Sequence, residues 1–315
     1  MRNITLENAA PTATKSGFIA IIGLPNAGKS TLFNALVGEK LAAVSLKPQT
    51  TRGRLRGILH EDEAEFIFVD TPGFQEKVAE ENLLNKMMNK AAFSSLKDAD
   101  VVIYLIDASR GWQANDTQLL GKMAEKNRKK ILIALSKTDR IIKARIKENK
   151  KIIMAQLEEL NFPKSSIDIS AKVKTSLIPL KQKMKELLPE GPWHYEEGDL
   201  TNLPEKNICA EYVREQLFRQ LGQEVPYCCS VKIDQLTNQA NKVIIDCTLV
   251  LSKESLKPML IGKKGTTVQK IREASEVSLS KFFSKPAQLH IFVKVDKNWQ
   301  NNLSSLLEME NFIEE

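Results

Sequence analysis

Residues 23–30, Gly-Leu-Pro-Asn-Ala-Gly-Lys-Ser, fit the phosphate-loop pattern G-x-x-x-x-G-K-[ST]. The apolar run 18–22 has the length of a buried strand, and residues 31–37 have helical spacing that ends at Gly38. A strand, a glycine-rich turn and a helix in this order favour a loop whose backbone N–H groups face a phosphate at a helix N-terminus. The predicted nucleotide contacts in and beside this loop are Gly23, Leu24, Pro25, Asn26, Ala27, Gly28, Lys29, Ser30 and Thr31.

Length and composition predict a basic protein of two domains. The chain has 315 residues and a formal net charge of +7, and a basic surface fits an acidic partner. It contains no run of 18 apolar residues, and residues 1–16 lack the apolar core of a signal peptide, so we expect a cytosolic protein. The four cysteines have no C-x-x-C spacing, which favours buried thiols over a zinc site.

A long polar segment after the first helix is predicted to complete the phosphate site. Residues 38–56 have no periodicity, and a loop of this length inside a compact domain is usually functional. We choose Thr51, with Thr50 as the alternative, as the threonine that closes over the γ-phosphate and binds Mg²⁺. In the phosphate loop, Lys29 is expected to reach the β- and γ-phosphates and the Ser30 hydroxyl to bind the same ion.

The next buried strand ends at a second candidate metal ligand. The apolar run 65–69 leads into Asp70-Thr71-Pro72-Gly73. Asp70 is predicted to serve Mg²⁺, and the Gly73 N–H is predicted to meet the γ-phosphate. Phe74 follows, at the place where Ras-like proteins have the glutamine that orients the attacking water, so this chain must orient its water by other means.

A third strand end predicts base selectivity. The apolar strand 131–135 delivers Ser136-Lys137-Thr138-Asp139. The carboxylate of Asp139 can accept hydrogen bonds from N1–H and the 2-amino group of guanine, which adenine cannot supply, and the stem of Lys137 can lie along the base. Strands and helices alternate up to residue 189, which predicts a doubly wound α/β domain whose ligand loops follow the strands.

The order GLPNAGKS, TT, DTPG, SKTD, SAK resembles the translation-factor-related GTPases, and KPQTTR with DTPGF looks like the Era family. The resemblance implies that Thr51 and Asp70 serve Mg²⁺, that Lys137 and Asp139 read guanine, and that Ser170 and Ala171 touch it by backbone. One departure is Ser136, because the family has Asn there. The loop also resembles those of potassium-stimulated GTPases, in which Asn26 would help to hold K⁺. The expected catalytic residues are Lys29, Thr51, Gly73 and Asn26.

The second half has the features of an RNA-binding domain. Residues 190–203 break the alternation and are predicted to form a linker, and 205–221 are predicted to form an amphipathic helix. Residues 253–297 hold ten Lys or Arg against four Asp or Glu, the electrostatic footprint of a nucleic-acid binder. A G-x-x-G loop between two helices brings backbone and lysines to nucleotide phosphates. The expected RNA contacts are Ile261, Gly262, Lys263, Lys264, Gly265 and Lys270.

The linker sequence PEGPWHYEEGDLTNLPEK and the closing FVKVDKNWQNN also resemble the Era family. This resemblance implies a smaller α+β domain of the type II KH fold, binding to small-subunit (16S) rRNA near its 3′ end, and a role in 30S ribosomal subunit assembly. A monomer in the cytoplasm is expected, with peripheral contact to the inner membrane left open. The predicted divisions are an N-terminal arm, a GTP-binding domain, a linker, a KH domain and a C-terminal tail: 1–16, 17–189, 190–203, 204–302 and 303–315.

The sequence therefore predicts a GTPase that binds GTP or GDP with Mg²⁺ and uses the nucleotide to control RNA binding. Two rivals belong to other classes. The first is an RNA-binding KH module whose GTPase domain no longer cycles, which Ser136 and Phe74 make conceivable. The second is a metabolic P-loop phosphotransferase, against which Asp139 argues because adenine gives that carboxylate nothing to bind.

Overall fold

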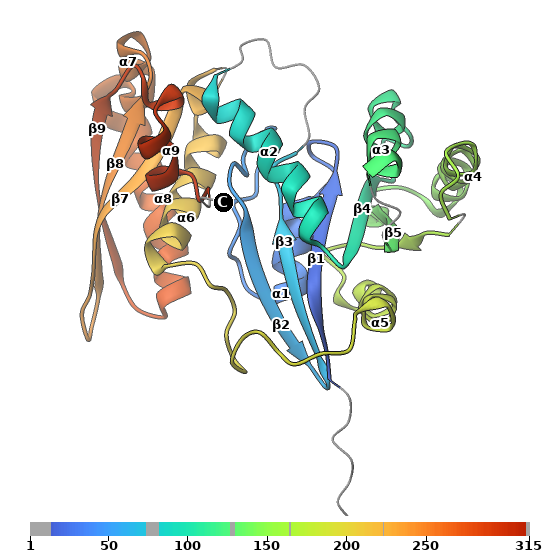
Figure 1. Ribbon diagram of the computed structural model, residues 1–315. Helices are drawn as coiled ribbons and strands as arrows, with labels where there is room; N and C mark the ends of the chain where they lie inside the picture. Colours follow the sequence, from blue (N-terminus) through green and yellow to red (C-terminus); the bar gives the residue numbers. More distant parts are fainter. Residues whose placement is uncertain (1–13, 74–81, 127–129, 164, 223, 313–315) are drawn as a thin grey trace, which may run out of the picture.

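The structure is a computed structural model that describes residues 14–73, 82–126, 130–163, 165–222 and 224–312. Within these residues the first domain contains a six-stranded sheet of order β2-β3-β1-β4-β5-β6 (Figure 1). All neighbouring strands are parallel except β2, which pairs antiparallel with β3 and makes the sheet mixed. The strands are β1 (Lys15–Gly23), β2 (Leu55–Glu61), β3 (Ala64–Asp70), β4 (Val101–Asp107), β5 (Lys130–Ser136) and β6 (Ile167–Asp168).

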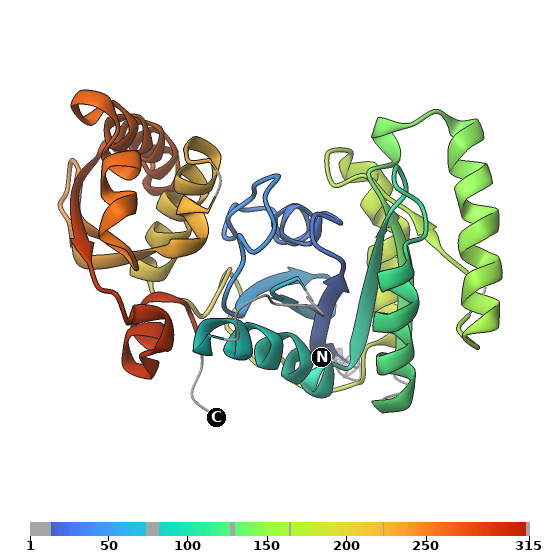
Figure 2. The ribbon, with the colours of Figure 1, turned by 90° about the horizontal axis from the view of Figure 1, so that it is seen from above.

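Helices cover both faces of this sheet, as the predicted doubly wound fold requires. Alternate residues of β1 point to opposite faces, so that Ile19 and Ile21 enter one core and Ala20 and Ile22 the other. The first core also contains side chains of α1 and α5, and the second those of α3 and α4 (Figure 2). The helices of this domain are α1 (Lys29–Val37), α2 (Leu83–Asp98), α3 (Ala114–Lys126), α4 (Lys143–Glu159) and α5 (Ile178–Leu187).

The second domain has a three-stranded sheet of order β7-β8-β9, in which β8 pairs antiparallel with β7 and parallel with β9. Ile245, Cys247 and Leu249 alternate along β8 and are fully buried. Helices α6 and α8 pack against each other beside this sheet. The elements are α6 (Glu205–Gln220), β7 (Cys229–Asn238), β8 (Val243–Leu251), α7 (Lys257–Ile261), α8 (Thr266–Phe283), β9 (Ala287–Val295) and α9 (Leu303–Met309).

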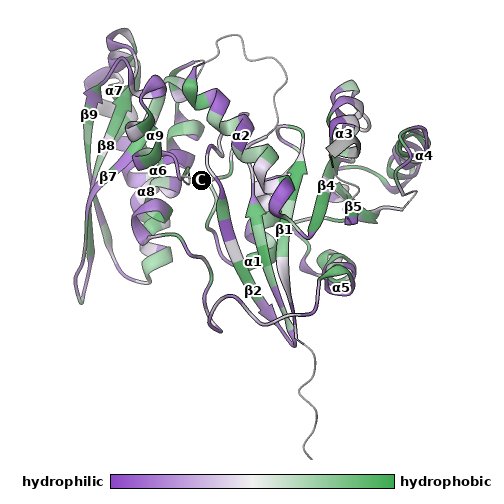
Figure 3. Ribbon diagram, viewed as in Figure 1, coloured by the Kyte–Doolittle hydropathy of each residue, from purple (hydrophilic) through white to green (hydrophobic). Residues whose placement is uncertain are grey.

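Helix α6 is not amphipathic, so this expectation was wrong. Every residue from Ile208 to Phe218 is buried, including Glu211, Arg214 and Glu215. A helix that is buried all round lies inside a core or between two bodies. Figure 1 shows α6 between the sheet of its own domain and the first domain, and Figure 3 shows that polar and apolar residues alternate along it. Two of its buried charges, Glu211 and Glu215, accept backbone N–H groups of the first domain, whereas Arg214 pairs with Glu310 of the C-terminal segment.

The segment 190–203, expected as a linker, lies along the edge strand β2. The N–H of Ile58 donates to Leu200 O at 2.9 Å, and the Thr201 hydroxyl donates to Arg56 O at 2.6 Å. The fully buried carboxylate of Glu65 accepts the backbone N–H groups of His194 at 2.8 Å and of Tyr195 at 2.9 Å. These bonds fix where the chain leaves the first domain.

The segment predicted as a C-terminal tail contains a helix and buried residues. Residues 303–309 form α9, and Leu306 and Glu310 are fully buried. Leu306 packs in a cluster with Leu84 and Met88 of α2, so the C-terminal segment joins the two domains. Residues 1–13, most of the expected arm, lie outside the described residues. No helix in the described part of the chain is long and apolar enough to cross a membrane.

Candidate nucleotide and RNA sites

The phosphate loop follows β1 and ends at α1. A side chain at Gly23 would meet Leu105 O at 2.5 Å, and Gly28 has a φ of 103°, so both positions need glycine. Lys29 lies over the loop, where its Nζ donates to Gly23 O and Leu24 O at 3.1 Å each. Burial lowers the pKa of Lys29 to about 8. A phosphate in the loop would replace these carbonyls and hold the ammonium charged.

Three predicted metal ligands meet at the edge of the loop. The Ser30 Oγ lies 2.9 Å from the Thr51 Oγ1, which donates to Asp70 Oδ2 at 3.2 Å. Asp70 is fully buried and its Oδ1 has no hydrogen-bond partner among the described residues. Two hydroxyls and an orphaned carboxylate oxygen are the hard oxygen donors that Mg²⁺ prefers, so these residues fit the ion. The alternative Thr50 bonds instead to Ser45 and Lys47 inside its own loop.

The buried negative charge of Asp70 is expected to lower the free energy of unfolding of the metal-free chain. Burial raises its pKa to about 6, from 3.8, so the ionised form is disfavoured in the fold without metal. Asp70→Asn is therefore expected to stabilise the nucleotide-free chain in EDTA at pH 7.5 by about 3 kcal/mol. The penalty appears as pH rises from about 4 and is complete above about 6, because only then is the folded-state carboxyl ionised.

Chemical denaturation of Asp70→Asn and wild type at pH 7.5 and at pH 4 checks this prediction. The advantage of the variant should shrink toward zero at pH 4, where the carboxyl is largely protonated in the folded state. An equal stability of the two proteins at pH 7.5 would show that Asp70 carries no buried charge to be neutralised.

Other predicted phosphate contacts lie close to Lys29. A side chain at Gly73 would meet the Lys29 Nζ at 3.2 Å and the Pro25 Cα at 3.3 Å. The Thr71 hydroxyl donates to Ile21 O at 3.1 Å and so ties the end of β3 to β1. Phe74 lies outside the described residues. Glycine at position 73 thus leaves the space beside Lys29 open for a phosphate.

On the guanine side, Lys137 connects two parts of the site. Its Nζ donates to Asn26 O of the phosphate loop and, at 2.7 Å, to Asp107 Oδ2. Burial opposes the ionisation of Asp107, but hydrogen bonds from Lys137 and Ser109 hold its pKa below the usual value. Asp107 was missed by the sequence reasoning, although it ends β4 as Asp70 ends β3.

The expected base contacts lie on the loop after β5 and the loop after β6. Asp139 Oδ1 accepts the Ser170 hydroxyl at 2.7 Å, and the Thr138 hydroxyl donates to Ile169 O at 3.0 Å. Ala171 follows in the same turn and is half-buried. The structure thus brings Asp139 and Ser170 together, and the second carboxylate oxygen of Asp139 lies 4.0 Å from the ammonium of the exposed Lys172.

Ser136 still braces the phosphate loop, although the resemblance leads one to expect Asn. Its hydroxyl is buried and lies 2.6 Å from Ala27 O and 3.2 Å from Ile106 O. The shorter contact joins the end of β5 to the phosphate loop. The departure in sequence therefore does not leave the loop unsupported.

A pocket of about 600 Å³ opens at these loops, a size that suits a small ligand. Residues of the phosphate loop and residues 43–51 line it. Arg219 of α6 also lines it, so the second domain contributes to the nucleotide pocket. The sequence reasoning missed three lining arginines, Arg110, Arg140 and Arg219, because each reaches the pocket from outside the motifs.

The G-x-x-G loop joins α7 to α8 and has the backbone that a close approach requires. Gly262 has a φ of 76°, and a side chain there would overlap Thr267. Lys264 also has a positive φ, 54°, and turns the chain into Gly265. Lys263 and Lys264 are exposed, as is Lys270 one turn along α8, while Ile261 is half-buried. The loop thus presents the cations of Lys263 and Lys264 to solvent.

Known proteins share this arrangement. Residues 18–137 match the 50S ribosome-binding GTPase family, and residues 224–300 match the KH domain family. A protein named GTPase Era from Marinobacter nauticus is 35% identical, over 95% of this chain and 96% of its own length. The protein of that name from Caldanaerobacter subterraneus is 37% identical, over 92% of this chain and 95% of its own length. This chain belongs to the GTPase Era family.

Solved structures of the Era family agree with the fold. A variant of Aquifex aeolicus Era bound to GDP·AlF₄⁻ has a TM-score of 0.87 and 31% identity, and the match covers 95% of this chain and all of that one. Era in complex with MgGDPNP and nucleotides 1506–1542 of 16S ribosomal RNA matches with the same TM-score, identity and coverage. The predicted α/β GTPase domain with a C-terminal KH domain is confirmed, and the chain is a GTPase of this family.

Proposed function

We propose that this Era-family chain is a GTP-driven switch that binds small-subunit rRNA near its 3′ end and assists assembly of the 30S subunit. The observation that carries the proposal is the position of the switch loop, which we define as residues 38–53. This loop contributes Thr51 to the metal site and also inserts Arg52 into the KH domain. One loop therefore links the nucleotide site to the RNA-binding domain. The complex of a relative with MgGDPNP and 16S rRNA nucleotides supports the same pair of ligands.

The nucleotide is held, in this proposal, by the residues of the phosphate loop and by Asp139. Mg²⁺ would bind to Ser30, Thr51 and Asp70 and would neutralise charge on the β- and γ-phosphates. Lys29 adds a cation at the same phosphates, and the Gly73 N–H would donate to the γ-phosphate. We propose the domain limits 17–189 and 204–302, joined by the linker 190–203. The rival of a non-cycling GTPase domain predicts no multiple turnover of GTP.

We propose K⁺ as a further cofactor, held in part by Asn26. Asn26 lines the pocket within the phosphate loop, so its side-chain oxygen can reach a cation placed beside the phosphates. GTP hydrolysis is expected to be faster in KCl than in NaCl at equal ionic strength. In Asn26→Ala the difference should vanish while GTP still binds. Equal rates for the wild-type protein in the two salts would assign the missing catalytic charge to bound RNA or a ribosomal partner.

The RNA site is tested by reversing charge on the G-x-x-G loop. Lys263→Asp with Lys264→Asp should weaken binding of RNA and lower its salt slope by roughly 0.7 for each phosphate that the loop no longer neutralises. GTP hydrolysis without RNA should stay near the wild-type rate. Lys143→Asp with Lys147→Asp is the matched control, because these exposed lysines of α4 lie far from the KH domain (Figure 1). An unaltered salt slope in the first variant would place the RNA site elsewhere.

We also propose that the protein is a cytoplasmic monomer whose main partner is the 30S subunit. Its net charge of +7 supports binding to a polyanion such as rRNA. The same charge supports peripheral contact with an anionic inner membrane. Sedimentation with vesicles of anionic lipid tests that contact, and sedimentation of the chain alone tests the monomer.

A further inference from the structure

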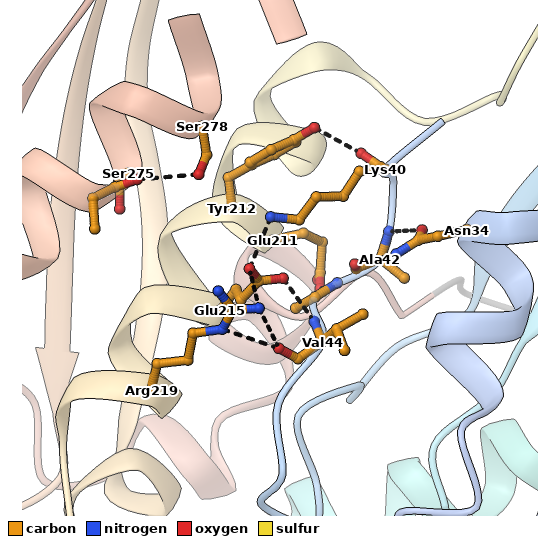
Figure 4. Close-up of polar contacts among 12 residues, drawn as sticks. Asn34, Lys40, Ala42, Val44, Glu211, Tyr212, Glu215, Arg219, Ser275 and Ser278 are labelled. Atoms are coloured by element: carbon orange, nitrogen blue, oxygen red, sulfur yellow. Dashed lines mark hydrogen bonds and ion pairs between the residues drawn. The ribbon is translucent and has the colours of Figure 1, made fainter. Parts of the chain in front are cut away.

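The part of the switch loop before Thr51 is held by carboxylates of the KH domain. The backbone N–H of Val44 donates to Glu215 Oε2 at 2.9 Å, and the N–H of Ala43 donates to Glu211 Oε2 at 3.4 Å. The Lys40 ammonium lies 2.8 Å from Glu215 Oε1. Figure 4 shows Glu215 between Val44, Lys40 and Arg219, with Glu211 one helical turn away. The loop is thus bound by its backbone.

Glu215 is buried at this contact, whereas its two cationic partners are partly exposed. Its side chain is 1% exposed, whereas those of Lys40 and Arg219 are 34% and 51% exposed. A buried carboxylate depends on its partners, because an uncompensated charge away from water is strongly unfavourable. Movement of the loop would take Val44 and Lys40 away from Glu215 together. The position of the loop and the environment of Glu215 are therefore linked.

The same loop segment is compact and continues directly to the metal site. The Ser45 and Thr50 hydroxyls lie 2.6 Å apart, and Thr50 also donates to Lys47 O at 2.9 Å. The Lys47 ammonium donates to Phe218 O at 2.6 Å, at the C-terminal end of α6, where a cation is favourable. Thr51, the next residue after this turn, contacts Ser30 and Asp70. A movement of the backbone at Val44 would therefore also move Thr51.

A second contact with the KH domain follows Thr51, and there both partners are buried. The Arg52 guanidinium is 2% exposed and bonds to Cys229 O and to the buried Glu310. A side chain at Gly53 would overlap Glu310 O, so the loop is packed tightly there. Arg52 therefore fixes one end of the loop, while the contact at Glu215 has exposed partners and can open at a lower cost.

We propose that Glu215 is a positioning residue through which the KH domain sets the place of the switch loop around the nucleotide. It acts through Val44 and Lys40 and touches neither nucleotide nor RNA. With GTP bound, Thr51 holds the loop at the metal site, and the contact with Glu215 closes. RNA on the KH domain and GTP in the pocket then favour the same state of this contact, and each raises the affinity of the other by the same factor.

The inference rests on the proposed function, in which RNA affinity depends on the nucleotide. The experiment measures the affinity of the full chain for an RNA with the 3′-terminal sequence of 16S rRNA, with Mg²⁺ and either GDP or a non-hydrolysable GTP analogue. The wild-type affinity is expected to differ between the two nucleotides by at least about five-fold. In Glu215→Ala, and to a lesser degree in Glu215→Gln, the ratio should fall below about two-fold. Glu205→Gln, an exposed carboxylate on the same helix, is the control and should keep the wild-type ratio.

The outcomes distinguish the proposed function from the role of Glu215. A wild-type ratio of one would overturn the proposed function and this inference with it. A wild-type ratio that persists in Glu215→Ala would overturn the inference alone. A second measurement uses only the wild-type chain, so it holds even if a variant does not fold. Hydrogen exchange of the backbone of residues 41–47 should be slower with the GTP analogue than with GDP, and equal exchange in the two states would also overturn the inference.

Discussion

Replacement of Arg52 by alanine is expected to destabilise the full chain by about 3 kcal/mol, the lower end of the range for breaking a buried ion pair. Its guanidinium donates to Cys229 O at 3.0 Å, to Pro226 O at 2.9 Å and to Glu310 Oε1 at 2.6 Å. Alanine would leave the two carbonyls without this donor and Glu310 with Arg214 as its remaining cation, at 2.9 Å. The lower end applies because Arg214 still compensates the charge.

Urea unfolding of Arg52→Ala measures this loss. Arg145→Ala, which removes an exposed arginine of α4, is the control and should change the free energy of unfolding by less than about 0.5 kcal/mol. The loss of stability in Arg52→Lys should lie between those of Arg52→Ala and the control. A lysine ammonium keeps the charge, but it cannot make the several hydrogen bonds of the planar guanidinium. If Arg52→Ala unfolds like the control, Arg52 does not join the two domains in solution.

Asp139→Asn is expected to abolish the preference for guanine. In the proposed site the carboxylate would supply two acceptors to the N1–H and 2-amino groups of the base, whereas the amide would supply one acceptor and one donor. One carboxylate oxygen already accepts the Ser170 hydroxyl at 2.7 Å, which orients the side chain. The substitution should weaken GTP binding by about 2–4 kcal/mol, roughly 30- to 1000-fold, and favour xanthosine triphosphate instead.

Competition titrations with GTP, xanthosine triphosphate and ATP check this change of preference. Asp168→Asn is a suitable control, because that carboxylate is half-exposed and pairs with Lys150 at the edge of the sheet. Undiminished GTP affinity in Asp139→Asn would mean that other residues read the base.

The motif residues of the nucleotide site were predictable because the predicted strands place them at one edge of the sheet. Parallel strands end at the same edge of a sheet, so Gly23, Asp70 and Ser136, at the ends of β1, β3 and β5, had to lie near one another. The alternation of apolar strands and helices predicts that sheet without further information. Asp107, at the end of β4, follows from the same rule and was missed because no motif marks it.

Contacts between the domains could not be read from the sequence. Arg52 and Glu310 are 258 residues apart, and no local pattern predicts that they meet. Residues 205–221 were predicted to form an amphipathic helix, whereas Glu211 and Glu215 of this helix are buried against the switch loop. The choice between Thr50 and Thr51 likewise needed the path of the loop, because neighbouring residues of an irregular segment have no fixed faces.

The central claim is that the nucleotide controls how tightly the protein binds the 3′ end of the small-subunit rRNA. Crosslinking of the wild-type chain to RNA in cell extract, followed by sequencing, tests it most directly when done with GDP and with a non-hydrolysable GTP analogue. With the analogue, the crosslinks should gather near the 3′ end of the small-subunit rRNA and map on the protein to the loop Gly262–Gly265. With GDP they should be several-fold fewer. Equal crosslinking in the two states, or crosslinks spread over unrelated RNAs, would contradict the account.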